Sequence, residues 1–232
     1  MSTIDEDGRQ IPMVKEDLVQ AAPVGEPLSS FLTMFHYGRG IFPWLRKDDR
    51  ILWWSPRPRA VIFTKDIHVS RSMQKVMRRG HFWVTADTAF EQVVVSCRDV
   101  KRSSDPGSWI DEDFLDVFCN LNKLGHAHSI EVWEGDELVG GLFGICVGQI
   151  FFGCSMFHTR ANASKVALIR LARVLEDWGF PVIDCQICNP HLKRMGAQLM
   201  PRDKFHVMAS TLIRGKRRIG SWTKYFDAEG GV

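Results

Sequence analysis

This sequence of 232 residues has no long apolar run, and no stretch approaches the roughly 20 residues that a helix needs to span a bilayer. Its first ten residues, MSTIDEDGRQ, are acidic and polar, so they lack the basic and apolar regions of a secretory signal. The composition is otherwise that of a globular protein, with 45% hydrophobic and 25% charged residues. We therefore expect a cytoplasmic protein that makes no use of a membrane.

Motifs for metals and nucleotide phosphates are also scarce. Cys185 and Cys188 have the spacing of half a zinc site, but no second pair follows, and on a strand their side chains would point to opposite faces. We favour structural cysteines there, and free thiols for all six cysteines. His126 and His128 would share a strand face without a third ligand nearby, which favours packing or hydrogen bonding. The patterns G-x-G-x-x-G and G-x-x-x-x-G-K-[ST], which cradle phosphates, are absent.

Positive charge is distributed unevenly, although the net charge is only +3. Residues 1–29 carry a net charge of −4, so the remainder carries +7. A basic body fits a phosphate backbone as a partner, and it equally fits an ordinary solvated surface, so charge alone leaves both interpretations open. The bases cluster at Arg57/Arg59, Arg71/Lys75/Arg78/Arg79, Lys193/Arg194 and Arg214/Lys216/Arg217/Arg218.

Hydrophobic period and capping signals predict an α+β fold, because helices come first, then an antiparallel meander, then helix–strand–helix. Residues 1–26 have no sustained period and are expected to form a flexible acidic arm, and the tail after Arg214 is expected to be mobile. Strands are predicted at 81–86, 127–134, 137–147, 149–153 and 181–187. Helices are predicted near residues 28–38, with Leu28, Phe31, Leu32 and Phe35 on one face, and then from Ser70 to Gly80, from Asp87 to about Cys97, from Asp111 to Gly125, from about Asn162 to Gly179, and from Pro201 onwards.

Two segments have compositions that point to chemistry. Ile51-Leu-Trp-Trp-Ser-Pro-Arg-Pro-Arg59 places two tryptophans beside arginines, which suits an unstacked base and its phosphate. The alternative is that one tryptophan belongs to the core and the other packs partly exposed. Asp184 and Gln186 share one face of a short apolar strand, where buried polar groups need partners or a chemical role. A satisfied core network is the alternative there.

Motifs in a fixed order extend over most of the chain from Tyr37 to Phe205. They are Tyr37-x-x-Gly40-Ile-Phe-Pro-Trp44, Ile51-Leu-Trp-Trp-Ser-Pro-Arg-Pro-Arg59, Ile67-His-Val-Ser-Arg-Ser72, Val84-Thr with Ala89-Phe90, Trp109-Ile110, Leu124-Gly-His-Ala-His-Ser-Ile-Glu-Val-Trp133, Leu138-Val-Gly-Gly141, Ser155-Met-Phe157, Asn162-Ala-Ser-Lys165, Ile183-Asp-Cys-Gln186 and Gly196-Ala197. Each motif alone is weak, whereas the ordered set is highly specific. In this order the set resembles the leucyl/phenylalanyl-tRNA–protein transferases.

The resemblance implies a small N-terminal module on an N-acetyltransferase-like α+β domain with a mixed sheet flanked by helices. We expect the arm at 1–26, the module at 27–66, the catalytic domain at 67–213 and a basic tail at 214–232. The implied activity is transfer of Leu, Phe or Met from aminoacyl-tRNA to the N-terminal Arg or Lys of an acceptor protein, which marks the acceptor for degradation by the N-end rule. The family uses no metal and no cofactor.

The resemblance also implies roles for particular residues. An aminoacyl ester is already activated, so the enzyme mainly positions the acceptor amine and stabilises charge, without a Ser or Cys nucleophile. We expect Asp184 to offset the positive charge that develops on the attacking nitrogen, and Gln186 to orient the acceptor or the carbonyl. The other expected roles are binding of the terminal tRNA adenosine by Tyr37, Trp53, Trp109 and Phe118, an aminoacyl pocket at Cys154, Met156 and Cys185, and phosphate contacts from Arg57, Arg59, Arg71 and Lys165.

The sequence departs from the family pattern at several positions. A Gly-Gly-Asp-Leu segment ahead of the first helix is missing, so the N-terminal module is abbreviated. The motif Phe-Gly-Glu-Ser-Met-Phe reads Phe152-Gly-Cys-Ser-Met-Phe157, so Cys154 replaces a pocket carboxylate. A family Tyr is Phe118, a His is Asn122 and a Ser is His158. We expect a roomier and less polar pocket floor than the family pattern has.

Two other functions compete with this one. The first is an N-acyltransferase that uses acyl-coenzyme A, for which Asn162-Ala-Ser-Lys165 could bind an anion at a helix start. The glycine-rich pyrophosphate turn of that class is absent, and calorimetry with the coenzyme would separate the two. The second is a non-catalytic tRNA-binding relative that kept the fold after losing the pocket carboxylate, and it predicts tRNA binding without turnover.

Overall fold

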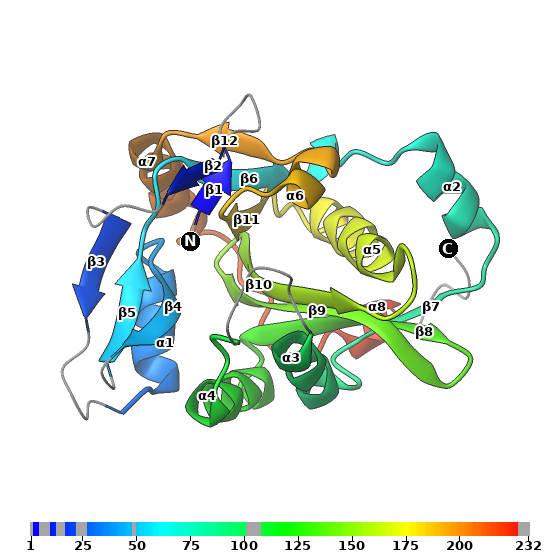
Figure 1. Ribbon diagram of the computed structural model, residues 1–232, viewed down its shortest axis with the longest axis horizontal. Coiled ribbons are helices and arrows are strands. Elements are labelled where there is room, and N and C mark those ends of the chain that lie inside the picture. The colour runs from blue at the N-terminus through cyan, green and yellow to red at the C-terminus, as the bar shows by residue number, and fades with distance from the viewer. Residues whose placement is uncertain are drawn as a thin grey trace.

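The computed structural model describes residues 2–4, 10–12, 17–21, 27–47, 50–100 and 108–226. A mixed sheet of seven strands in the order β12-β6-β11-β10-β9-β8-β7 runs through the molecule (Figure 1). Its neighbouring strands are antiparallel except β10 and β11, which are parallel. The strands are β6 (Arg59–Phe63), β7 (Trp83–Ala86), β8 (Ala127–Glu134), β9 (Glu137–Val147), β10 (Ile150–His158), β11 (Val182–Gln186) and β12 (Gln198–Met200).

A second, antiparallel sheet of three strands in the order β3-β5-β4 lies beside the large sheet (Figure 1). Residues 55–58 join its strand β5 directly to β6 of the large sheet. The elements of this part are β3 (Leu18–Ala21), α1 (Ser30–Tyr37), β4 (Phe42–Lys47) and β5 (Arg50–Trp54). Two further strands, β1 (Ser2–Ile4) and β2 (Gln10–Pro12), pair with each other as a separate sheet.

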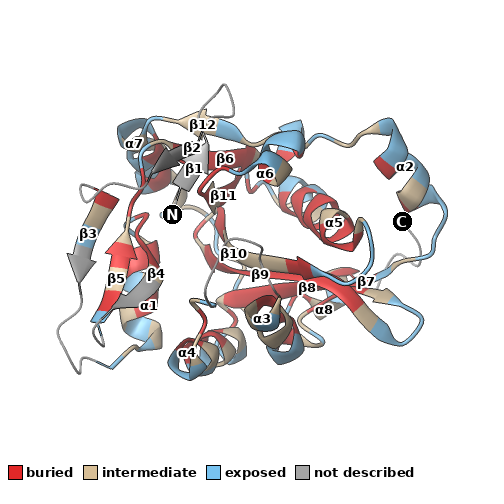
Figure 2. Ribbon diagram, in the orientation of Figure 1, coloured by how far each residue is buried: buried red, intermediate tan, exposed pale blue. Residues whose placement is uncertain are grey.

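Helices cover both faces of the large sheet, with α5 on one face and α3 and α4 on the other (Figure 1). Each face has its own apolar core, and the inner strands β8, β9 and β11 between them are buried over most of their length (Figure 2). No helix in the part of the chain that the structure describes is long and apolar enough to cross a membrane. The remaining helices are α2 (Arg71–Arg78), α3 (Phe90–Asp99), α4 (Glu112–Lys123), α5 (Ala163–Asp177), α6 (Pro190–Arg194), α7 (Arg202–Leu212) and α8 (Thr223–Phe226), with a 3-10 turn at Thr64–Asp66. The mixed sheet with helices on both faces confirms the predicted α+β class.

Local capping explains where several of the predicted helices begin and end. The Ser70 hydroxyl accepts from the Met73 amide at 3.2 Å, and the Asp111 carboxylate accepts from the Phe114 amide at 3.0 Å. Gly125 follows α4 with a φ of +75°, a conformation that favours glycine. These signals are short-range, so they could be read from the sequence alone.

The apolar face predicted for α1 is only half correct, because Leu28 and Leu32 pack against the core whereas Phe31 and Phe35 do not. Phe31 is 81% exposed and Phe35 is 48% exposed, and their rings pack on each other with centroids 6.5 Å apart. The helix instead buries Thr33, His36 and Tyr37. A period identifies the apolar side of a helix, but the neighbouring elements decide which side is covered.

Part of the arm predicted to be flexible is ordered. Strand β3 pairs with β5 along its backbone, and Asp17 just before it is buried. The Asp17 carboxylate lies 3.5 Å from the Arg57 guanidinium and 3.9 Å from that of Arg202. An edge strand such as β3 pairs through its backbone and needs no hydrophobic period, so sequence patterning missed it. Strands β1 and β2 of the arm are described as well, and they pair with each other. The other residues of the arm, a turn predicted at Pro106-Gly107 and the last six residues lie outside the described part.

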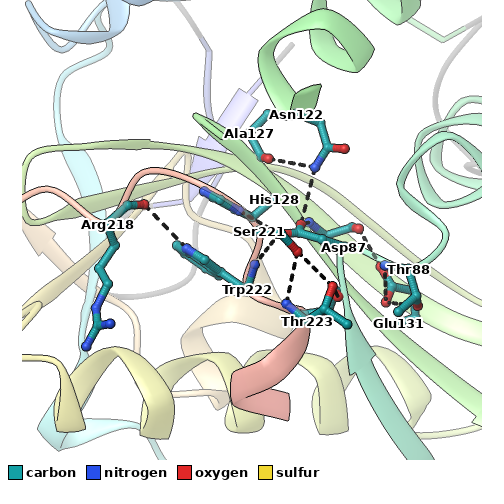
Figure 3. A network of polar contacts seen from close by, with 12 residues as sticks. Asp87, Thr88, Asn122, Ala127, His128, Glu131, Arg218, Ser221, Trp222 and Thr223 are labelled. Atoms are coloured by element: carbon teal, nitrogen blue, oxygen red, sulfur yellow. Dashed lines mark hydrogen bonds and ion pairs between the residues drawn. The ribbon is translucent and has the colours of Figure 1, made fainter. Parts of the chain in front are cut away.

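The tail after Arg214, predicted to be mobile, packs on the rest of the protein as far as Phe226, and Asp87 does not cap α3 as predicted. The Asp87 carboxylate instead accepts from the Trp222 amide at 2.8 Å, from the Ser129 amide at 3.0 Å and from Asn122, and it contacts His128 Nδ1 at 2.9 Å (Figure 3). Trp222 is buried and its ring stacks on that of His128 at 3.7 Å. This network fastens the C-terminal segment to the sheet. His128 both packs and hydrogen-bonds in it, the two roles that the sequence favoured over a metal site.

Candidate active site

A cavity opens where the parallel strands β10 and β11 separate. The two strands pair only as far as Phe152 and Asp184, and each then has a register shift against its antiparallel neighbour. Beyond this point, both strands line a cavity of about 370 Å³. This volume is in the range of small-molecule sites.

Apolar side chains dominate the cavity wall. They come from both strands, from β9, from α5 and from β4 of the small sheet, which contributes Phe42 and Trp44. A thiol group lines it at three positions, and polar groups are few. The wall consists of Phe42, Pro43, Trp44, Trp109, Leu142, Phe143, Phe151, Gly153, Cys154, Ser155, Met156, Leu168, Leu171, Ile183, Cys185, Gln186, Ile187, Cys188, Asn189, His191 and Leu192.

A buried ion pair lies in the wall strands. The Arg59 guanidinium donates to both carboxylate oxygens of Asp184, through Nε at 2.8 Å and Nη2 at 2.5 Å, and both side chains are fully buried. The guanidinium also lies over the rings of Phe42 and Phe205, 5.0 and 4.6 Å from their centroids. Asp184 itself does not line the cavity. Direct contact between this carboxylate and an attacking amine therefore does not fit its position.

Gln186 is the polar residue that connects this ion pair to the cavity. Its backbone amide donates to Asp184 Oδ1 at 2.9 Å, and its φ of +63° is unusual for a residue with a side chain. Gln186 lines the cavity, and its side-chain Nε2 is buried without a hydrogen-bond partner among the described residues. A buried amide donor without a partner carries a free-energy cost, which a ligand can remove.

Tyr37 and Cys154 form a second buried contact at the cavity. The Tyr37 hydroxyl lies 3.3 Å from Cys154 Sγ, and the Tyr37 ring packs edge-on against Phe152. Burial raises the pKa of the Cys154 thiol to about 12, and burial followed by Cys154 raises the pKa of Tyr37 well above its usual value. Both groups are therefore neutral at physiological pH.

Of the four residues predicted to bind adenosine, only Trp109 lines the cavity. Tyr37, Trp53 and Phe118 are at most 1% exposed and offer no free ring face to a base. Trp53 stacks on His36 at 4.1 Å, and Phe118 supports Trp109 edge-on at 6.0 Å. The prediction of base stacking is therefore wrong for these three residues.

Two further residues line the cavity that were not predicted from the sequence, Trp44 and His191. Trp44 is the last residue of the motif Tyr37-x-x-Gly40-Ile-Phe-Pro-Trp44, which was a usable signal. Adenosine binding was predicted instead for Trp53, one of the paired tryptophans of the next strand. Burial, followed by nearby Lys165, lowers the pKa of His191, which favours the neutral ring. No local signal distinguished this histidine.

The predicted aminoacyl-pocket residues Cys154, Met156 and Cys185 all line the cavity together. Burial raises the pKa of the Cys185 thiol strongly. All six cysteines are free, as predicted. Within the described residues, no group of three His, Cys, Asp or Glu side chains could hold a metal ion.

The predicted phosphate contacts divide into two groups. Arg71 is exposed, Arg57 is half-exposed beside Asp17, and the Lys165 ammonium, partly buried, donates to Asn162 Oδ1 at 3.0 Å. Arg59 is fully buried and already paired with Asp184. The phosphate prediction is therefore wrong for Arg59, because charge clustering in a sequence does not reveal which arginine is buried.

Comparison with known proteins identifies close relatives. A family model described as leucyl/phenylalanyl-tRNA protein transferase matches residues 61–210, and a model of its N-terminal domain matches residues 37–57. The leucyl/phenylalanyl-tRNA–protein transferase of Hydrogenovibrio crunogenus is 45% identical over 182 residues, 78% of this chain and 71% of the relative. That of Myxococcus xanthus is 41% identical over 213 residues, 92% of this chain and 91% of the relative. That of an Anaeromyxobacter species is 47% identical over 199 residues, 86% of this chain and 85% of the relative.

Among solved structures, L-PGS from Bacillus licheniformis aligns with a TM-score of 0.44 and 11% identity, over 69% of this chain and 65% of that one. A similarity at this level does not decide the fold family.

Proposed function

Because this chain belongs to the leucyl/phenylalanyl-tRNA–protein transferase family, we propose that it transfers an apolar aminoacyl group from tRNA to the N-terminus of an acceptor protein. The donors are Leu, Phe or Met, and the acceptors begin with Arg or Lys. The acceptor amine attacks the ester carbonyl, a peptide bond forms, and the bond to the ribose oxygen breaks. The proton lost by the amine passes to that oxygen.

The observation that supports this proposal is the apolar cavity between β10 and β11. Its floor of aliphatic and aromatic side chains suits an apolar aminoacyl side chain, and its scarce polar groups would disfavour a charged one. Trp44 and Trp109 line the same cavity and present aromatic surface on which the terminal adenosine could stack. The donor would thus be held by its two ends.

The polar residues of the cavity would position the reacting atoms. The Gln186 carboxamide is the group best placed to hydrogen-bond the acceptor amine or the ester carbonyl. Asp184 would act through Gln186, since its own oxygens are occupied. Arg57, Arg71 and Lys165 remain proposed phosphate contacts for the tRNA backbone.

We also propose the finer architecture that the motifs imply. The large sheet with its helices would be an N-acetyltransferase-like catalytic domain, and the small sheet with α1 would be the abbreviated N-terminal module. The cytoplasm is the proposed location, because charged tRNA is used there.

Transfer of labelled Leu, Phe and Met from charged tRNA to a test protein that begins with Arg tests the proposal. The same protein with an N-terminal Ala is the matched control. Transfer to the Arg-initiated protein alone supports the proposed function. Binding of charged tRNA without transfer would contradict it and favour the non-catalytic relative, a possibility raised by the lost carboxylate at Cys154.

A further inference from the structure

Burial of the Arg59 guanidinium costs free energy. Its guanidinium is removed from water and sandwiched between Phe42 and Phe205, and its Nη1 is buried without a partner among the described residues. Replacing a buried ion pair with apolar side chains of similar volume often leaves a fold equally stable or more stable. Stability of the fold therefore does not by itself account for this arginine.

The contacts of the ion pair lead to the cavity. Asp184 Oδ1 receives two donors, Arg59 Nε at 2.8 Å and the Gln186 backbone amide at 2.9 Å. The second donor belongs to the residue with a φ of +63°, at the register shift where β11 leaves its regular pairing with β6. A non-glycine residue holds such a backbone conformation only when its surroundings enforce it. The carboxylate supplies that restraint, and the arginine fork holds the carboxylate.

We propose that Arg59 is a positioning residue for the transfer reaction: through Asp184 it fixes the backbone of Gln186 and thereby aims the carboxamide into the cavity. Phe42 extends this role, because it both lines the cavity and stacks against the guanidinium. The arginine thus links a cavity wall from the small sheet to the polar group on β11. This inference rests on the proposed function, since it assigns a role within that reaction.

Arg59→Lys is the first test, because lysine keeps the positive charge but lacks the planar fork that holds both carboxylate oxygens. We expect kcat to fall about 10- to 100-fold, the size of effect that a small misplacement of a reacting group produces. The KM for charged tRNA should stay within about twofold, because the fork contacts no cavity surface itself. A wild-type kcat in this variant would overturn the proposal.

The double variant Arg59→Met/Asp184→Asn guards against a folding failure, because it leaves no unpaired charge in the core. Its cooperative melting should be retained while kcat falls to a similar extent. A folded double variant with wild-type kcat would show the ion pair to be structural and would overturn the proposal.

Asp87→Asn is the matched control, since Asp87 is another buried carboxylate with several amide partners, but it does not line the cavity. It should lower the melting temperature and leave kcat unchanged. An equal loss of kcat there would overturn the proposal, because destabilisation alone would then explain the effect. Two further measurements test the proposed function separately. The wild-type protein should transfer the aminoacyl group, and Gln186→Ala should lose this activity. If both results are obtained while Arg59→Lys is fully active, only the proposed role of Arg59 is contradicted.

Discussion

The side chain at position 154 contributes to the polarity of the cavity wall. Cys154 contributes a thiol that stays protonated at physiological pH, because its pKa is about 12, and the Tyr37 hydroxyl is its neighbour. Cys154→Glu would place a carboxylate within reach of that hydroxyl. We expect the ratio of transfer rates among the Leu, Phe and Met donors to change by about tenfold, the scale on which one pocket group discriminates side chains. Rates measured with each charged tRNA check this.

The matched control for position 154 is Cys154→Ser, which keeps the size and neutrality of the side chain and should leave the donor ratios within about twofold. Equal donor ratios in the Glu variant, with folding intact, would place this residue outside the working pocket. Burying an ionised Glu should also lower the melting temperature.

Two tryptophans that look equivalent in the sequence should respond differently to truncation. Trp53→Ala should lower the free energy of unfolding by about 3–5 kcal/mol, because the side chain is fully buried against His36. Trp109→Ala should keep the fold and weaken binding of charged tRNA about tenfold or more, because a stacked base is worth about 1–3 kcal/mol. Denaturant unfolding and tRNA titration separate the two effects. A stable Trp53→Ala variant with weakened tRNA binding would instead support adenosine binding by Trp53.

The error at Trp53 has a physical origin in strand register. Alternation along β5 makes Ile51 and Trp53 buried and Leu52 and Trp54 partly exposed. Alternation can be read from the sequence, but the side on which the core lies depends on how β5 pairs with β3 and β4. The paired tryptophans therefore identified an important strand and left its buried member undecided.

At the scale of elements, predictions succeeded where the signals are local. The helix α4, with its cap at Asp111 and its stop at Gly125, follows from residues within a few positions of its ends. The meander of β8 and β9 was predicted with its observed bounds, whereas β10 continues five residues past its predicted end. Those extra residues, 154–158, lie beyond the point where β10 and β11 part. The cavity arises from this separation, which involves residues far apart in sequence.

The C-terminal segment is expected to stabilise the fold rather than to act in transfer. Trp222→Ala should lower the free energy of unfolding by about 3–5 kcal/mol, because it removes a buried ring that stacks on His128. Trp222→Phe keeps an aromatic ring and should cost much less. Urea unfolding measures both, and the transfer rate of the folded fraction should match wild type. A loss of transfer without a loss of stability would assign the segment to the reaction.

The C-terminal segment also contacts the end of α4, where Gly220 lies against Gly125. A Cβ added at Gly125 would lie 2.1 Å from the Gly220 amide nitrogen, and the φ of +75° disfavours any side chain. The Gly125 carbonyl also accepts from the Gly220 amide at 3.2 Å. The helix stop and the docking of the C-terminal segment thus depend on the same glycine, which ties two elements almost a hundred residues apart.

At the scale of the whole molecule, the net charge of +7 outside residues 1–29 includes both exposed and buried basic side chains. Arg71, Lys75, Arg78 and Arg79 are exposed on or next to α2, whereas Arg59 is paired inside the protein. A count of charges from the sequence cannot separate the two, because burial is a property of the fold. The exposed group is the part that can meet a phosphate backbone.

Affinity for charged tRNA should therefore depend steeply on salt. About four phosphate contacts would give a log–log slope near −3.6, or roughly a 100-fold loss of affinity between 50 and 200 mM salt. Arg71→Gln should reduce the slope by about 0.9, the loss of one contact. Arg160→Gln removes the same formal charge, but Arg160 is already paired with Glu134 and Glu137, so the slope should stay unchanged. Titrations at several salt concentrations measure all three slopes. A flat response in the wild type would remove the electrostatic basis for tRNA binding, and equal slopes in the two variants would reduce it to net charge alone.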